Sequence, residues 1–287
     1  MTGPVELSTD EARAIIDVER GGRLASLEIR GRQVLVGPPD RSDRSITWGS
    51  FLMAPWPGRL AEGRLRWAGE TLQLQRNHGR HAIHGSVFDR GWRLDAVTLV
   101  ACQLSVSLDR ARWPFGGTVR QVLSLAPGRL SMSAEIAADA PMPAALGWHP
   151  WFRRSIGQGR DPEVRLQVLA AGILERRAMI PTGRVITPAG TADLSGGPRL
   201  GRRRLDDVYV GVRRPPVLSW PGLRLTFELG PALQAVTVYT PAQAICVEPQ
   251  TAWPNALGLD WPEAERAGAA MVEPGRPLRA AWTLRWD

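Results

Sequence analysis

Residues 129–137 read Arg-Leu-Ser-Met-Ser-Ala-Glu-Ile-Ala, and along them apolar and polar side chains alternate. A period of two residues is typical of a β-strand with one buried and one exposed face. The same alternation recurs in four further stretches, at residues 104–108, 223–229, 235–239 and 280–286. The chain is therefore predicted to consist mainly of strands.

Many of the 30 glycines and 24 prolines fall between these stretches, at Pro-Gly pairs such as residues 57–58, 127–128, 221–222 and 274–275. Such pairs are typical of turns. Many short strands joined by turns predict an all-β fold, a large antiparallel β-sandwich with few short helices. Without a linker, a repeat or a low-complexity block, we expect one domain over residues 1–287.

Convincing helical patterns are scarce. Residues 9–16 begin like a helix capped by Thr9 or Asp10, but residues 14–18 fit an early strand equally well. Residues 262–268 are compatible with one short turn of helix.

Composition favours a soluble, cytoplasmic protein that binds neither membranes nor nucleic acids. No apolar run approaches the ~20 residues that span a bilayer, and the N-terminus lacks the features of a signal peptide. The net charge is +8, yet all 36 basic residues are arginines, and they are scattered. The densest cluster, residues 202–204, is followed almost at once by Asp206 and Asp207, which indicates composition bias rather than a phosphate-binding stripe.

Neither the cysteines nor the clustered histidines predict a metal site. Cys102 and Cys246 lie far apart in apolar segments and are expected to be buried, inert thiols. His78, His81 and His84 follow each other at intervals of three, but intervening glycines disfavour the helix that would align them. We expect a loop with two solvated histidines and one working histidine, and no metal.

Three short motifs each place a proton-transfer group beside turn residues. They are residues 82–85 (Ala-Ile-His-Gly), residues 147–152 (Gly-Trp-His-Pro-Trp-Phe) and residues 247–256, which begin Val-Glu-Pro-Gln-Thr. Taken singly, His149 could be a core histidine and Glu248 a strand-end surface residue. Together, His84, His149 and Glu248 could move protons on and off oxygen without a cofactor.

In this order, the motifs resemble those of the aldose 1-epimerases, or galactose mutarotases, which interconvert the anomers of free sugars. The resemblance extends over almost the whole chain, because further family-like segments occur in sequence order at residues 21–27, 55–60, 205–209 and 272–275. It implies the large mutarotase-like sandwich, a small-molecule sugar substrate, no cofactor, and a monomer or homodimer.

Carried over residue by residue, the resemblance implies five roles. Glu248 would be the general base that removes the proton of the anomeric hydroxyl, and His149 the general acid that protonates the ring oxygen. His84 would donate to the same oxygen or stabilise its developing charge, while Arg59 and Asp206 would hold sugar hydroxyls.

Four positions depart from the family pattern. Gly58, Ser86, Trp151 and Asn255 stand where asparagine, glycine, tyrosine and aspartate are common. None of them is a proposed acid or base, so they leave the preferred sugar open. The Pro-Trp-Pro and Gly-Trp-His segments are closer to a divergent bacterial branch than to galactose-specific enzymes.

Two other functions compete with this one. Arg80, Arg153 and Arg154 could bind a phosphorylated or sulfonated sugar on the same fold, although in a protein whose basic residues are all arginines we expect them to be solvated charges. A non-catalytic carbohydrate-binding domain would share the sandwich but would not need two histidines and a glutamate. We expect one or two tryptophans in the cleft, among Trp56, Trp92, Trp148, Trp151 and Trp253.

Overall fold

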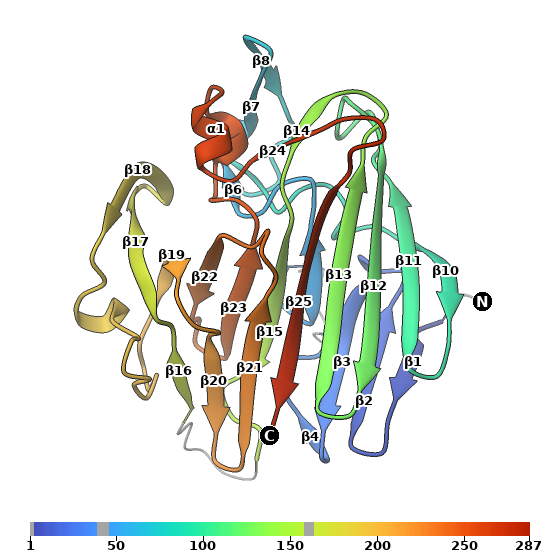
Figure 1. Cartoon of the computed structure of the whole chain (residues 1–287), viewed down its shortest axis with the longest axis vertical. Helices are drawn as coiled ribbons and strands as arrows, with labels where there is room; N and C mark the ends of the chain where they lie inside the picture. The colour runs from blue at the N-terminus through green and yellow to red at the C-terminus, as the bar shows by residue number, and fades with distance from the viewer. Residues whose placement is uncertain (1–2, 39–45, 158–163) are drawn as a thin grey trace.

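Two large antiparallel sheets are stacked face to face in the computed structural model, which describes residues 3–38, 46–157 and 164–287 (Figure 1). One sheet has eleven strands and the other has eight. The predicted all-β sandwich is therefore confirmed.

The larger sheet has a continuous path of ten strands, and β4 (Arg32–Gln33) extends it by pairing with β3. In spatial order the path is β1 (Val5–Ser8), β2 (Ala12–Asp17), β3 (Arg23–Ile29), β5 (Ser50–Met53), β15 (Gly147–Arg153), β23 (Ala244–Gln250), β22 (Ala235–Tyr239), β19 (Asp206–Val212), β17 (Ala170–Arg177) and β18 (Ile180–Ile186).

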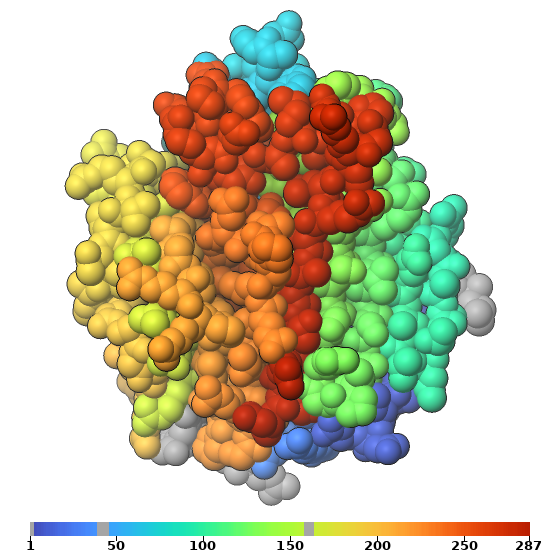
Figure 2. Space-filling model, viewed as in Figure 1, coloured from blue at the N-terminus to red at the C-terminus, as the bar shows by residue number. Residues whose placement is uncertain are grey.

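The smaller sheet joins strands from the middle and the end of the chain. In order they are β10 (Arg93–Val97), β11 (Ala101–Ser107), β12 (Thr118–Ala126), β13 (Arg129–Ala137), β25 (Leu278–Trp286), β21 (Leu223–Leu229), β20 (Val217–Trp220) and β16 (Arg165–Gln167). Figure 2 shows this side of the molecule, with the C-terminal strand β25 (red) lying between β13 (green) and β21 (orange).

The remaining elements are short. Three two-stranded sheets pair β14 (Met142–Ala144) with β24 (Ala270–Val272), β6 (Arg59–Leu60) with β9 (Ala82–Ile83), and β7 (Arg64–Trp67) with β8 (Glu70–Gln73). The helical elements of the described chain are η1 (Ala61–Gly63), η2 (Gly190–Ala192), η3 (Ala256–Gly258) and α1 (Glu263–Arg266). Among the described residues, no helix is both long and apolar enough to cross a membrane.

The alternating stretches form the strands that they predict. In β13 every second residue is buried, and the strand spans all of residues 129–137. Its hairpin with β12 turns at Pro127-Gly128, where Gly128 has φ of 71°. A Pro-Gly pair suits this turn because proline fixes a negative φ and glycine tolerates a positive one.

The ambiguous segment near the N-terminus is a strand and not a helix. β2 covers residues 12–17 and pairs with β1. Thr9, a candidate helix cap, instead lies in the hairpin turn, where its hydroxyl accepts a hydrogen bond from the Ala12 N–H at 3.2 Å. The short helix expected within residues 262–268 is confirmed as α1.

Aromatic side chains fill the space between the two sheets behind β15. Phe227 of β21 stacks on Trp282 of β25 with ring centroids 5.6 Å apart, and Phe152 of β15 meets Phe227 edge-on at 5.5 Å. Trp148 of β15 contacts Trp282 in the same way at 6.4 Å. This packing on the core side of β15 gives a rigid support to the side chains on its other face.

Candidate active site

Strand β15 presents its side chains alternately to the core and to the face of the larger sheet that points away from the smaller one. Trp148 and Phe152 belong to the core, whereas His149 and Trp151 lie on the opposite face and stack on each other at 5.1 Å. We call this opposite face of the larger sheet the site face. His149 lies on the site face because successive side chains of a strand point to opposite faces of the sheet.

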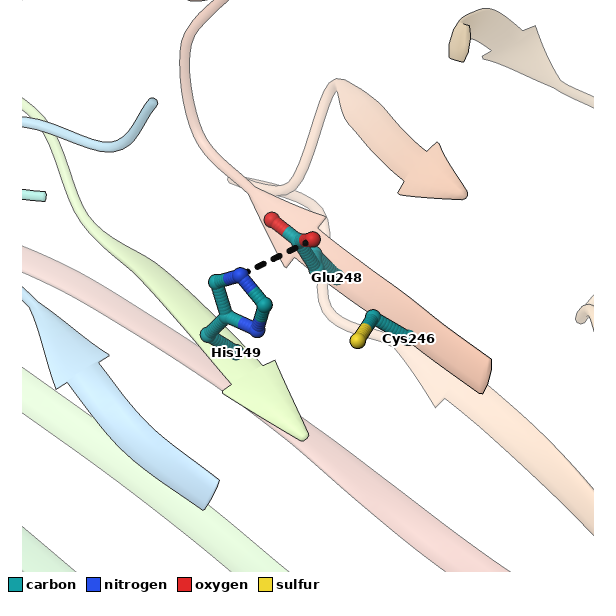
Figure 3. A group of neighbouring side chains, drawn as sticks. All are labelled: His149, Cys246 and Glu248. Atoms are coloured by element: carbon teal, nitrogen blue, oxygen red, sulfur yellow. Dashed lines mark ion pairs between the residues drawn. The ribbon is translucent and has the colours of Figure 1, made fainter. Parts of the chain in front are cut away.

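Strand pairing brings His149 and Glu248 together on the site face. Gly147 of β15 pairs with Gln250 of β23, and Trp151 pairs with Cys246, so the register places His149 opposite Glu248. The His149 Nε2 atom lies 3.3 Å from the Glu248 Oε1 atom, and both side chains are about 95% buried (Figure 3). The two groups to which the resemblance gives the roles of acid and base are thus in contact.

Burial determines how this pair titrates. Burial lowers the pKa of His149 to about 3 and raises the pKa of Glu248 well above its usual value. The negative charge of Asp206 raises the pKa of Glu248 further, whereas the hydrogen bond from Gln250 lowers it. Adding a second proton to the pair and removing the first are therefore both disfavoured. Because the groups are coupled, we treat them as one unit that holds a single proton over a wide pH range.

This arrangement predicts an unusual pH profile. A solvated histidine acid would produce an inflection near its ordinary pKa of about 6.5. For the sugar interconversion that the resemblance implies, the rate, corrected for the rate in buffer alone, should be flat through that region. It should fall as the pH approaches about 3, where the pair takes up a second proton, and again above the raised pKa of Glu248, where the pair loses its first. Polarimetry across a buffer series checks this, with His78→Gln removing an exposed histidine as a control. A tenfold loss of rate per pH unit above about 6.5, where a solvated histidine acid would lose its proton, would contradict the shared-proton account.

His84 reaches the pair from a tight turn after β9. A side chain at Gly85 would place a Cβ atom 1.9 Å from the backbone oxygen of Ala54, and His84 itself has φ of 60°. Glycine is therefore required at position 85, because the backbone of Ala54 passes too close for any side chain. The buried ring of His84 lies 5.0 Å from that of His149 at an angle of 87°, and its pKa is lowered by burial and by His149.

The two predicted sugar-holding residues approach from different sides. Arg59 opens β6 opposite Ile83 of β9, next to His84, and forms no ion pair with another described residue. Asp206 opens β19 opposite Tyr239 of β22.

A cavity of about 460 Å³ connects these groups. Its lining includes Arg59, His84, His149, Asp206 and Glu248. The volume lies in the range usual for small-molecule sites. The structure thus brings together all five side chains that the resemblance singles out.

Gln250 and Thr237 line the cavity as well and were not assigned a role from the sequence. The Gln250 Nε2 group donates to the Glu248 Oε2 atom at 3.1 Å and to the Thr237 hydroxyl at 3.0 Å. The amide therefore orients the carboxylate. A two-residue spacing after Glu248 on one strand was the available signal, because residues i and i+2 share a face.

Arg176 also lines the cavity and was not singled out from the sequence. It lies on β17, and its guanidinium donates to the Asp206 Oδ1 atom at 3.0 Å and lies 3.5 Å from the Asp207 Oδ1 atom. No local motif marks it, since its meeting with Asp206 depends on the pairing of β17 with β19.

The arginines proposed as anion ligands lie elsewhere. Arg153 is exposed and donates to the backbone oxygen of Leu35. Arg154 is buried and donates to four backbone oxygens, which belong to Pro241, Gly201, Arg203 and Thr240, so the expectation of a solvated charge is wrong for it. Arg80 is exposed and pairs with Glu62.

The other residues considered from the sequence are two histidines, five tryptophans and two cysteines. His78 is exposed at the rim of the cavity, and partly buried His81 accepts a hydrogen bond from the Glu62 N–H at 3.1 Å. Of the five candidate tryptophans, Trp151 lines the cavity, as expected for one or two of them. Both cysteines are free and buried, as predicted.

The chain is similar in sequence to known proteins. The sequence model of the aldose 1-epimerase family matches residues 4–285. The uncharacterized protein YihR of Escherichia coli K12 is 29% identical over 295 residues, which covers 98% of this chain and 92% of YihR.

Solved structures show the same fold. A galactose mutarotase-like protein from Clostridium acetobutylicum superposes with a TM-score of 0.87 at 15% identity, covering 99% of this chain and 95% of that one. The GalM/aldose epimerase homologue of C. elegans gives 0.86 at 16% identity, with coverages of 100% and 99%. The match to the family model along nearly the whole length shows that the chain belongs to the aldose 1-epimerase family.

Proposed function

We propose that the protein interconverts the α and β anomers of a free hexose by acid–base opening and closing of the ring. The observation that carries this proposal is the contact of 3.3 Å between His149 Nε2 and Glu248 Oε1 on the floor of the cavity. Mutarotation needs one group that removes a proton from the anomeric hydroxyl and one that protonates the ring oxygen. A buried pair with a single proton supplies both.

The reaction begins with the shared proton on His149. Glu248, as a carboxylate, accepts the proton of the anomeric hydroxyl, while His149 gives its proton to the ring oxygen. The C1–O5 bond breaks, and the electrons of the former O1–H bond form the carbonyl. Rotation about C1–C2 and reversal of both transfers return either anomer.

Proton transfer leaves a carboxylic acid beside a neutral imidazole. This is the form of the pair that burial favours, because neither partner is then charged. The same neutral form is available while the ring is closed, so the pair speeds proton transfer in both directions without shifting the equilibrium between ring and open chain. Each positioned acid or base contributes typically 10²–10⁴-fold in rate, which suffices for a reaction that already proceeds in water.

The other lining groups hold the sugar. The planar guanidinium of Arg59 suits two neighbouring hydroxyls, and Asp206 accepts hydrogen bonds from others. Neutral His84, next to His149, donates to the ring oxygen as its charge develops.

A polarimetric panel tests the function. Freshly dissolved α-D-glucose and α-D-galactose should approach their equilibrium rotation faster with the protein than in buffer. If all sugars tested bind, as measured by calorimetry, and none is accelerated, the chain is a carbohydrate-binding domain and the proposal is wrong.

An anionic hexose is the second candidate substrate. The observation in its favour is that two guanidinium groups, Arg59 and Arg176, line the cavity, and Arg59 has no ion-pair partner among the described residues. Adding a phosphorylated and a sulfonated hexose to the panel distinguishes the two substrate classes.

Replacement of Arg176 should separate binding from chemistry. Arg176→Leu removes the ion pair that orients Asp206, and hydrogen bonds to charged groups are worth about 1.5–3 kcal/mol. We expect KM for a neutral sugar to rise roughly ten- to hundredfold with kcat nearly unchanged. The KM of Arg176→Lys should lie between those of the wild type and Arg176→Leu. A fall in kcat at constant KM would contradict a positioning role. A loss confined to anionic sugars would show that Arg176 binds the charge directly.

A further inference from the structure

Beside the acid–base pair lies a free thiol that the proposed reaction does not use. Cys246 precedes Glu248 by two residues on β23, so both side chains lie on the site face. One imidazole nitrogen of His149, the Cys246 Sγ atom and one carboxylate oxygen of Glu248 all lie within 4.8 Å of one another. Figure 3 shows the His149 ring facing the Glu248 carboxylate, with Cys246 next to them on the same strand as Glu248.

From this juxtaposition we propose that His149, Cys246 and Glu248 form a binding site for a thiophilic divalent ion such as Zn²⁺, and that the bound ion inhibits the enzyme. Imidazole, thiolate and carboxylate are the ligand types that zinc takes in proteins. With metal–ligand distances of about 2.0–2.3 Å, the donors of a tetrahedral site lie roughly 3.3–3.8 Å apart. The observed separation of 3.3 Å between His149 and Glu248 already meets this requirement, and small side-chain movements bring the sulfur into range.

The donors are also available to an ion. The ring of His149 is more than nine-tenths buried, and its Nε2 atom, which faces Glu248, is the nitrogen offered to the ion. The Nδ1 atom has no hydrogen-bond partner among the described residues and can carry the ring proton, which leaves Nε2 free to coordinate. His149 and Glu248 line the cavity, which gives the ion a route of entry and leaves its fourth coordination position for water. The thiol proton and the proton shared by His149 and Glu248 pass to the solvent when the ion binds.

Inhibition follows because the ion occupies both proton-transfer groups. This half of the inference depends on the proposed mutarotase function, whereas ion binding does not. Thiolate ligation should favour Zn²⁺ and Co²⁺ over Mg²⁺ and Ca²⁺, which prefer oxygen ligands.

Cobalt titration followed by absorbance tests binding independently of activity, because a thiolate bound to Co²⁺ gives an intense near-ultraviolet charge-transfer band. The wild type and Cys102→Ala should both show this band, and Cys246→Ala should not. Cys102 is a matched control, because it is the other free, buried cysteine and lies on β11 of the smaller sheet. Absence of the band from the wild type, or its persistence in Cys246→Ala, would overturn the proposal.

Activity titrations with Zn²⁺ test the inhibition. Cys246→Ala should keep its activity in metal-free buffer, and inhibition should require at least about tenfold more Zn²⁺ than in the wild type. A chelator should restore the wild-type rate, and Mg²⁺ should have no effect. Equal inhibition of both proteins would contradict the proposal. A cobalt band in a protein that accelerates no sugar would leave the metal site standing and refute the mutarotase function.

Discussion

Glu248→Gln should reduce the enzymatic rate of mutarotation by roughly 10²–10⁴-fold while leaving the cavity intact. An amide has nearly the shape of the carboxylate but cannot accept the proton of the anomeric hydroxyl. The hydrogen bond that Gln250 donates to this side chain remains available, and so does the one by which Thr237 holds Gln250. Polarimetry with a sugar that the wild type accelerates measures the change.

Thermal unfolding provides the control for this variant. Burial raises the pKa of Glu248, so the folded state keeps this proton to a higher pH than the unfolded state does. The free energy of unfolding of the wild type therefore falls as the pH rises above the unfolded-state value of about 4.3. Glu248→Gln should therefore be at least as stable as the wild type at pH 8, and its advantage should shrink as the pH falls toward 4.3. A variant that is folded and fully active would contradict the assigned base.

His149→Gln should cause the second large loss, again about 10²–10⁴-fold. The imidazole lies between Phe51 and Trp151, with ring centroids 4.9 Å and 5.1 Å away, and this stacking fixes its orientation toward Glu248. Glutamine can donate a hydrogen bond to the ring oxygen but cannot give up a proton to it.

The matched control is His78→Gln, which replaces an exposed histidine at the rim of the same cavity. Its rate should stay close to that of the wild type. If His78→Gln lost as much activity as His149→Gln, the acid would have been assigned to the wrong histidine.

Much of the fold could be predicted from the sequence because alternation and turn chemistry are local properties. Residues 129–137, 223–229 and 235–239 coincide with observed strands, and Pro-Gly pairs lie at the predicted turns. The segment at residues 9–16 was ambiguous because Thr9 and Asp10 suit both a helix cap and a turn, and only pairing with β1 decides between them.

The site was harder to predict because it depends on which strands are neighbours. The resemblance identified His84, His149 and Glu248, but the contact between the last two arises from the register of β15 against β23, which no local pattern encodes. Arg176 was missed for the same reason, since it meets Asp206 through the pairing of β17 with β19. Arg154 was predicted to be a solvated charge, but it is buried and donates to backbone oxygens. These oxygens belong to segments distant in sequence, so no local pattern indicates its burial.

Exchange between anomers at equilibrium tests the central claim most directly. Magnetisation transfer between the α and β anomeric protons of an equilibrated hexose should be accelerated by the wild type and should return to the buffer rate with Glu248→Gln. That result would establish that the buried His149–Glu248 pair opens and closes the sugar ring. Failure of the wild type to accelerate exchange of glucose, galactose or an anionic hexose, or equal acceleration by Glu248→Gln, would contradict the account.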